Sequence, residues 1–344
     1  MFLKAPRTAV QFGDGQSRKR CGPWTSNASA GIFVGKPSRG RTPREGPRVA
    51  KHRGAGTVSP MPELPEVEVL CRRLAPRLAG RILQRVEIHR PASIHRSSTR
   101  TFTGHCIGRV FGPVSRRAKR LLFGLKSDGG LSDGFLQIHL GMTGRVAVVD
   151  SGQESPSYPA VTFHLDQGRL VFSDARGLGR IDRVWAMPEG LGPEPLDPEF
   201  TPGRLATALG NSSQPIKVRL MDPRCLAGIG NIYAAECLFE AEIHPKRPTR
   251  DLREVEVQRL HRAIRSVLSE AIDVGWAVTR SRDPAKWTLF HRETRGLGSD
   301  GKGSGFRVYD REGAPCPRCG LPIQRIRQAA RSTYLCPGCQ PLKP

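Results

Sequence analysis

The spacing of apolar residues after position 60 predicts first a helix and then a series of strands. Apolar side chains recur at three- and four-residue steps at the start of this region, which indicates one apolar face of a helix; they are Val67, Leu70 or Cys71, Leu74 and Leu78. Apolar and polar residues then alternate in short segments bounded by Gly, Pro, Ser and Asp, which is typical of antiparallel strands in a sandwich. These segments cover residues 82–88, 121–125, 136–140, 161–165 and 170–172.

The helical period returns after a proline-rich stretch. Residues 188–202 contain five prolines and two glycines, and we interpret them as a linker between domains. Asp251 with Glu254 has the spacing of a helix-capping pair, and Gly275 is a natural stop for that helix. The segment 280–306 contains G-S-D-G-K-G-S-G and is predicted to be a mobile loop. The apolar side of the helix is predicted to consist of Leu252, Val255, Leu260, Ile264, Leu268 and Ala271.

Length and charge narrow the class of protein. A chain of 344 residues favours two domains or more, and its formal net charge is +24. Of this charge, +14 belongs to residues 61–344, so the body of the chain is basic without its first 60 residues. Each Lys or Arg placed on a phosphate releases counterions, so this surplus favours a polyanionic partner, although ribosomal and membrane-surface proteins share the composition. No run of 18 apolar residues occurs, so we predict no membrane span.

The first 60 residues form a basic leader that is rich in Gly, Pro, Ser and Arg. They show no apolar period and are predicted to be disordered. No continuous apolar core of the secretory type follows the initial charges, which argues against a signal peptide. Three interpretations remain: an upstream stretch translated by mistake, which we favour, a removable organelle transit segment, or a retained basic tail.

Four cysteines near the carboxyl end have the spacing of a metal site. Cys316, Cys319, Cys336 and Cys339 give C-x2-C-x16-C-x2-C, and four thiolates at this spacing can close a tetrahedron around one zinc ion. The alternative is two disulfides, but the other five cysteines form no framework of the kind found in secreted domains. A zinc ion with four protein ligands has no open position, so its role is predicted to be structural.

The string M-P-E-L-P-E at residues 61–66 resembles the amino terminus of the formamidopyrimidine-DNA glycosylase family. Removal of Met61 frees the secondary amine of Pro62, and an amino terminus has a pKa of about 8, so roughly a tenth is neutral at pH 7. The resemblance implies that Pro62 attacks C1′ of the damaged nucleotide, expels the base and forms a cationic iminium, which promotes loss of the 3′ phosphate and then of the 5′ phosphate. A retained leader would make the Pro62 nitrogen an amide and abolish this chemistry.

The two glutamates of this string carry different expectations. By resemblance, Glu63 is the acid and base that protonates the sugar ring oxygen; it also suits the start of a helix, and both roles are compatible. Glu66 is a weaker catalytic candidate than Glu63, because a structural role in the first helical turn explains this carboxylate at least equally well.

Other family motifs follow in the same order along the chain. Lys119, within R-R-A-K-R-L-L, matches the family lysine that binds phosphate, and Arg331, within the Q-x-A-R-x-T-x-x-C pattern of residues 328–336, matches the arginine that grips phosphates and assists strand scission. The segment 221–236 resembles the helix, two turns, helix element, in which Asn231 and Tyr233 are assigned to DNA binding. Lys217 either adds a phosphate contact or is a solvated surface lysine.

The resemblance also places residues in the DNA duplex. In H-L-G-M-T-G, His139 is expected to contact a phosphate and Met142 to fill the gap left by the extruded base. In D-A-R-G-L-G, Arg176 is the second gap filler, whereas Leu178 departs from the phenylalanine of the family. Tyr158 and Ala160 stand where the family has a histidine.

Together these patterns predict a multidomain α+β protein. The expected parts are a leader (1–61), an N-terminal antiparallel β-sandwich with flanking helices (62–190), a linker (191–202), a helix-two-turns-helix domain with a mobile loop (203–305) and a zinc finger (306–344). The zinc finger is expected to hold one structural Zn²⁺.

The predicted function is that of a bifunctional DNA glycosylase and abasic-site lyase of base excision repair. Its substrates would be oxidised purines such as 8-oxoguanine and formamidopyrimidines in double-stranded DNA, and abasic sites. We expect a monomer in the bacterial cytoplasm, with the nucleoid, or in an organelle if the leader is a transit segment. One alternative is the same chemistry on oxidised pyrimidines. The other is a non-catalytic zinc-ribbon protein that binds damaged DNA.

Overall fold

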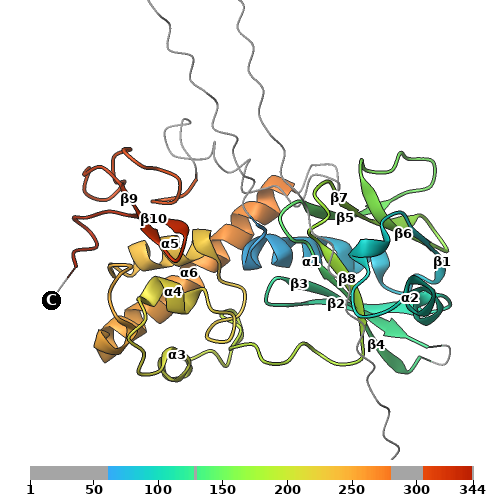
Figure 1. Cartoon of the computed structure of the whole chain (residues 1–344), viewed down its shortest axis with the longest axis horizontal. Helices are drawn as coiled ribbons and strands as arrows, with labels where there is room; N and C mark the ends of the chain where they lie inside the picture. Colours follow the sequence, from blue (N-terminus) through green and yellow to red (C-terminus); the bar gives the residue numbers. More distant parts are fainter. Residues whose placement is uncertain (1–60, 128–129, 280–304, 343–344) are drawn as a thin grey trace, which may run out of the picture. The chain divides into compact units, whose positions relative to one another are not determined.

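Two four-stranded antiparallel sheets form the first part of the molecule (Figure 1). The computed structural model describes residues 61–127, 130–279 and 305–342, so the predicted leader and almost all of the predicted mobile loop lie outside the described residues. One sheet has the strand order β1-β6-β7-β5 and the other β2-β3-β4-β8. The elements are α1 (Leu64–Leu78), β1 (Leu83–Ile88), η1 (Pro91–Ser93), α2 (Thr99–Cys106), β2 (Val110–Arg117), β3 (Arg120–Lys126), β4 (Ser132–His139), β5 (Gly144–Val149), β6 (Pro159–Leu165), β7 (Arg169–Asp174) and β8 (Arg180–Val184).

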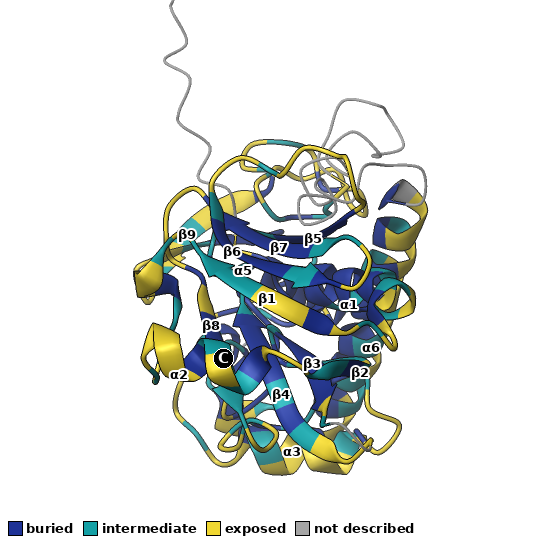
Figure 2. Cartoon of the chain, turned by 90° about the vertical axis from the view of Figure 1, so that its right-hand side faces the viewer, coloured by how far each residue is buried: buried dark blue, intermediate teal, exposed yellow. Residues whose placement is uncertain are grey.

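The inner faces of the two sheets share one apolar core with α1 (Figure 2). The apolar face predicted for α1 is confirmed, because all five of its residues are buried. The five predicted strand segments correspond to β1, β3, β4, β6 and β7. Since burial removes apolar surface from water, these rows of side chains hold the sandwich together. The largest buried side chains of this core are Phe102, Phe111, Phe123, Phe163 and Phe172.

The sequence pattern missed three strands of the sandwich, each for a local reason. In β2 the alternation is broken by Gly112 and Pro113, where the pairing with β3 shifts between Phe111 and Val114. β5 is a continuous apolar run without alternation, because both of its faces are covered. β8 is short and mostly charged. Strand pairing with distant residues therefore decides these segments more than their own composition does.

The helical part comprises α3 (Pro202–Leu209), α4 (Ile216–Leu220), α5 (Asn231–Glu240), η2 (Thr249–Asp251) and α6 (Glu254–Thr279). The predicted capping pair Asp251 and Glu254 is wrong. The observed capping contact lies two residues further along the chain, where the Arg253 backbone N–H donates to the Glu256 carboxylate at 2.9 Å. Val255 is 54% exposed and does not belong to the apolar face.

Helix α6 also continues through Gly275 to Thr279, so the predicted stop is wrong. Arg73 of α1 explains the extension. Its guanidinium donates to the Trp276 carbonyl at 2.6 Å and lies over the indole ring. A cation near the last carbonyls of a helix stabilises that end, and this one comes from a distant part of the chain.

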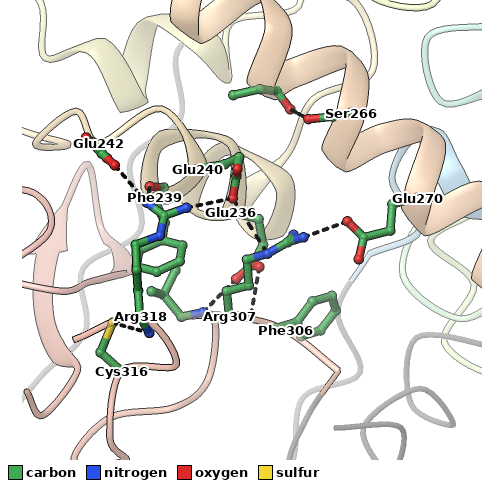
Figure 3. Close-up of polar contacts among 12 residues, drawn as sticks. Glu236, Phe239, Glu240, Glu242, Ser266, Glu270, Phe306, Arg307, Cys316 and Arg318 are labelled. Carbon is green, nitrogen blue, oxygen red and sulfur yellow. Dashed lines mark hydrogen bonds and ion pairs between the residues drawn. The ribbon is translucent and has the colours of Figure 1, made fainter. Parts of the chain in front are cut away.

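The carboxyl-terminal module contains the hairpin of β9 (Gln324–Gln328) and β10 (Arg331–Leu335). It is held on α5 and α6 by charged groups (Figure 3). Arg318 contacts Glu240 and Glu242, at 3.0 and 3.2 Å, and Arg307 contacts Glu270 at 2.6 Å. The buried Glu236 carboxylate accepts the consecutive backbone N–H groups of residues 307, 308 and 309. Among the described residues, no helix is both long and apolar enough to cross a membrane.

Candidate active site

The residues around Pro62 lie against the amino end of α5. Pro62 is buried, and Met61 before it is 39% exposed. The Glu63 carboxylate accepts the backbone N–H groups of Ile232 at 2.9 Å and Tyr233 at 3.3 Å. The first N–H groups of a helix have no partner within the helix and attract negative charge. The amino end of α5 therefore fixes Glu63 beside Pro62.

Glu66 supports this arrangement from the first turn of α1. Its carboxylate accepts the Glu63 backbone N–H at 2.8 Å and the Tyr233 hydroxyl at 2.8 Å. Both contacts hold neighbouring groups in place, which favours the positioning role over a direct catalytic one. Tyr233, expected to bind DNA, is only 2% exposed, and its hydroxyl donates to the Glu66 carboxylate.

Lys119 reaches the same point from the sandwich. It lies in the turn between β2 and β3, after Ala118, whose φ of 54° is left-handed. A Cβ built on Gly230 would collide with the Glu63 carboxyl group and lie 2.5 Å from the Lys119 Nζ. Only glycine at position 230 therefore leaves room for this carboxylate and this ammonium group to face each other.

Glu194, in the predicted linker, holds the turn that carries Lys119. The Glu194 carboxylate accepts the Ala118 backbone N–H at 2.6 Å and forms ion pairs with Arg116 and Arg117, at 2.7 and 3.0 Å. Nothing in the local sequence pattern marked Glu194, because its partners are more than 70 residues away in the chain. The sequence around Glu194 therefore gave no signal of this contact.

Burial dominates the electrostatics of this site. It raises the pKa of Glu63, an effect that the nearby Lys119 opposes and the Glu66 carboxylate reinforces. Burial also raises the pKa of Glu66. A carboxyl group with a raised pKa keeps its proton closer to neutral pH, which suits a general acid.

Lys217 is buried, so the alternative of a solvated surface lysine is wrong. Its Nζ donates to Asn231 Oδ1 at 2.6 Å, to Thr333 Oγ1 at 2.7 Å and to the Ser332 carbonyl at 3.2 Å. Burial lowers the pKa of Lys217 to about 8. An ammonium group has three N–H donors, and all three are used to join α4, α5 and β10.

Arg331 is exposed at the tip of the β9–β10 hairpin, after Ala329 and Ala330, which both have positive φ. It lines a cavity of about 290 Å³ with Lys217 and Gln328. The hairpin thus presents an unobstructed guanidinium close to the amino end of α5. This placement is compatible with the predicted grip on phosphate.

The four residues predicted to face DNA lie at the end of β4, which carries His139, and in two neighbouring loops. The half-buried Met142 lies between β4 and β5, and its sulfur is 3.5 Å from Arg176 Nη1 in the loop between β7 and β8. Arg176 and Leu178 are exposed. Burial, with the nearby Arg120, Lys119 and Arg180, lowers the pKa of His139. His139 thus favours its neutral form, in which one ring nitrogen can still donate a hydrogen bond.

The four predicted zinc ligands meet in the carboxyl-terminal module. One Sγ atom from each cysteine lies within 4.8 Å of the other three, and all four cysteines are free of disulfides. Backbone N–H groups of residues 318 and 339 point at the sulfurs of Cys316 and Cys336, at 3.4 and 3.5 Å. Such N–H···S contacts are expected where thiolates bind zinc. The residues fit one structural zinc ion with the ligands Cys316, Cys319, Cys336 and Cys339.

Loss of one zinc ligand should release the metal and weaken DNA binding. Cys316→Ser is expected to lower zinc content and to reduce DNA affinity by about tenfold or more, because binding of the metal supplies folding free energy to such modules. Cys71→Ser is the matched control, since Cys71 lies in the sandwich and its sulfur donates only to the Val114 carbonyl. Metal analysis and fluorescence anisotropy measure the two effects. A Cys316→Ser protein with full metal content and full affinity would contradict the assignment.

Comparison with known proteins gives matches over most of the chain. Three family models match: "Formamidopyrimidine-DNA glycosylase N-terminal domain" over residues 61–181, "Formamidopyrimidine-DNA glycosylase H2TH domain" over 191–283, and "Zinc finger found in FPG and IleRS" over 313–342. A formamidopyrimidine-DNA glycosylase of Symbiobacterium thermophilum is 41% identical over 291 residues, which cover 82% of this chain and 90% of that protein. A formamidopyrimidine-DNA glycosylase of Thermus thermophilus is 39% identical, and the match covers 81% of this chain and 98% of that protein.

Solved structures of the Lactococcus lactis protein Fpg are also similar. Its complex with DNA containing an abasic site has a TM-score of 0.70 and 29% identity, and covers 81% of this chain and 99% of that chain. Another complex, with DNA containing an oxidised pyrimidine, has a TM-score of 0.69 and 29% identity. The match covers 81% of this chain and 100% of that chain.

Proposed function

The chain belongs to the formamidopyrimidine-DNA glycosylase family and is a DNA glycosylase for oxidised bases, and we propose that it is also an abasic-site lyase that uses Pro62 as its nucleophile. One observation carries the proposal: Pro62 adjoins Glu63, whose carboxylate faces Lys119 across Gly230. A nucleophile and an acid from the start of α1 thus meet a cation from the β2–β3 turn at the amino end of α5. The active form begins at Pro62, because an amide nitrogen has no nucleophilic lone pair.

The reaction follows from these groups. The Pro62 nitrogen bonds to C1′ as the bond from C1′ to the base breaks, and the amine proton passes to the departing base. Protonated Glu63 then gives its proton to the sugar ring oxygen as the ring opens, and the nitrogen lone pair completes the iminium. The resulting iminium withdraws electrons from C2′. Loss of the C2′ proton then expels the 3′ phosphate, and a second elimination expels the 5′ phosphate. Water finally hydrolyses the iminium and restores the amine.

The surrounding cations are assigned to the DNA backbone. Lys119 and Arg331 come from the β2–β3 turn and from β10. His139 pairs with Arg120, next to Lys119, and Asn231 donates to the Ser332 carbonyl, next to Arg331. Lys217 has a different part in this proposal. Because its donors bind Asn231, Thr333 and Ser332, it acts on phosphate indirectly by aligning α5 with the hairpin that carries Arg331.

The enzyme should remove 8-oxoguanine and formamidopyrimidines from duplex DNA. An oxidised pyrimidine is the second candidate substrate, because Leu178 replaces the aromatic gap filler and the similar Lactococcus lactis protein is known in complex with DNA containing an oxidised pyrimidine. Excision rates on a panel of lesion duplexes test both. Faster excision of oxidised pyrimidines than of oxidised purines would overturn the purine assignment.

DNA affinity should fall steeply with salt through the assigned cations. Removing one phosphate contact reduces the slope of log affinity against log salt concentration by about one. We expect this reduction for Lys119→Met and for Arg331→Ala in fluorescence anisotropy. Arg204→Ala is the control, since Arg204 lies on α3 and pairs with Glu199 on the surface. An unchanged slope in both test variants would contradict their assignment to phosphates.

A further inference from the structure

Arg90 contacts the loop that carries the gap-filling residues, although nothing in the chain's motifs marked it. Arg90 follows β1, and its backbone N–H donates to the Ala160 carbonyl of β6 at 3.0 Å. Its side chain extends to residues 174–179, which we call the β7–β8 loop. There Nη1 donates to the Asp174 carbonyl at 2.5 Å. The guanidinium is thus anchored at both ends, by its own backbone and by the loop.

Gly177 makes the room for this guanidinium. A Cβ built on Gly177 would lie 3.1 Å from Arg90 Nη1 and 3.5 Å from Cζ. Gly177 also has a φ of +67°, a conformation that L side chains rarely adopt. The Arg90 guanidinium therefore lies directly against the backbone of the β7–β8 loop, between the two residues predicted to face DNA.

The loop is held on its other side by the buried Asp174 side chain. One carboxylate oxygen accepts the Arg176 backbone N–H at 3.1 Å and the other accepts the Gly179 N–H at 2.7 Å. The Thr143 hydroxyl, from the loop that carries Met142, also donates to Asp174. Asp174 thus joins the two loops internally, while Arg90 braces the β7–β8 loop from β1.

We propose that Arg90 is a positioning residue that holds Arg176 and Leu178 in the conformation that enters the duplex, and thereby sets discrimination of the base opposite the lesion. The inference rests on the proposed function. A side chain that fills the gap of an extruded base must keep its place while the neighbouring bases press on it. The exposed tip of this loop contains glycine and offers few side chains for packing, so an external brace decides how firmly it is held.

Arg90 should matter for a duplex substrate, which needs the gap-filling residues, and not for single-stranded DNA, which does not need them. Arg90→Ala is expected to slow excision from a lesion duplex by about tenfold, since small displacements of a positioned group have effects of this size. It should also reduce the spread of rates among the four opposing bases. Cleavage of an abasic site in single-stranded DNA, which has no opposite base, should stay within about twofold of wild type. Arg90→Lys should recover part of the duplex rate.

Arg85→Ala is the matched control, on the strand that precedes Arg90. Arg85 is 61% exposed and contacts His164 and Glu87, away from the β7–β8 loop. This variant should keep wild-type rates on both substrates. An Arg90→Ala protein that keeps the duplex rate and the discrimination would overturn the proposal. Equal losses on duplex and single-stranded substrates would also overturn it, because they indicate damage to the catalytic centre or to the fold.

A double-mutant cycle tests the contact itself. Gly177→Ala places a methyl group against the Arg90 guanidinium, so the double variant with Arg90→Ala should be less impaired than the sum of the single changes predicts. Strictly additive effects would show that the two residues act separately and would overturn the proposal. Fluorescence of 2-aminopurine opposite an abasic analogue reports insertion directly. If the wild-type protein gives neither a fluorescence signal nor excision, the proposed function fails. If the wild-type protein is active and Arg90→Ala gives the same signal and the same excision rate, only the inference about Arg90 fails.

Discussion

A chain that begins at Pro62 should cleave lesion DNA, whereas the same chain with residues 1–61 attached should lose at least about a thousandfold in strand scission. Without a free amine the Pro62 nitrogen cannot bond to C1′, and the remaining groups can only bind DNA. The Glu63 carboxylate is held by the backbone N–H groups of Ile232 and Tyr233, and these contacts do not involve the Pro62 nitrogen. The comparison therefore tests the need for a free amine at Pro62.

Borohydride reduction measures this prediction, because it converts the iminium into a stable adduct between protein and DNA. The adduct should form with the Pro62-initiated chain, and mass spectrometry should locate it on the terminal proline. It should be absent from the extended chain and from Pro62→Gly. Anisotropy supplies the control, since all three proteins should still bind an abasic-analogue duplex, and the extended chain should bind it more tightly at low salt because its leader is basic. Full activity in a molecule whose intact leader is verified by mass spectrometry would refute the mechanism.

Glu63→Gln should reduce base excision by about a hundredfold to ten-thousandfold, the usual contribution of a general acid. An amide cannot donate the proton that opens the sugar ring. It also presents an NH₂ group to one of the N–H groups of Ile232 and Tyr233 that the carboxylate now satisfies. Cleavage of a preformed abasic site should fall less, because its sugar already opens spontaneously to the aldehyde. Single-turnover rates on the two substrates measure the difference.

The pH dependence gives a second signature of Glu63. Burial raises the pKa of this carboxyl group, so the acid form persists above the ordinary range of glutamate and is lost as pH rises through the raised value. Wild-type excision should fall along that limb, and the limb should be missing in Glu63→Gln. Glu236→Gln is the matched control. Glu236 is another buried carboxylate that accepts backbone N–H groups, but it joins the zinc module to α5. An equal loss of excision rate in Glu63→Gln and Glu236→Gln would show that the loss comes from damage to the structure.

Local sequence was sufficient for the parts whose information is local. The apolar face of α1 follows from residue spacing alone, since one side of a helix is defined by steps of three and four residues. The zinc ligands follow from the spacing of two cysteine pairs. Pro62 and Glu63 could be proposed from the sequence because their chemistry depends on residue type and on their place in a short motif, and the family to which that motif points is confirmed.

Helix boundaries needed more than the pattern. The end of α6 lies beyond Gly275 because Arg73 of α1 reaches its last carbonyls. Strand β8 forms from a mostly charged segment because β4 pairs with it. In both places the decisive partner is distant in the sequence, so no window along the chain contains it.

The sequence by itself determined the family and the four zinc ligands, and it predicts the other groups that do chemistry: a proline amine, a neighbouring carboxyl group and a lysine assigned to phosphate. Only the tertiary structure decided how they are arranged. It brought Glu63 to the amino end of α5 and to Lys119 across Gly230, buried Lys217, clamped the Lys119 turn with Glu194 and set Arg90 against Gly177. The physical reason is that reactivity belongs to single residues and their near neighbours, whereas orientation and burial arise from contacts between segments that meet only when the chain folds.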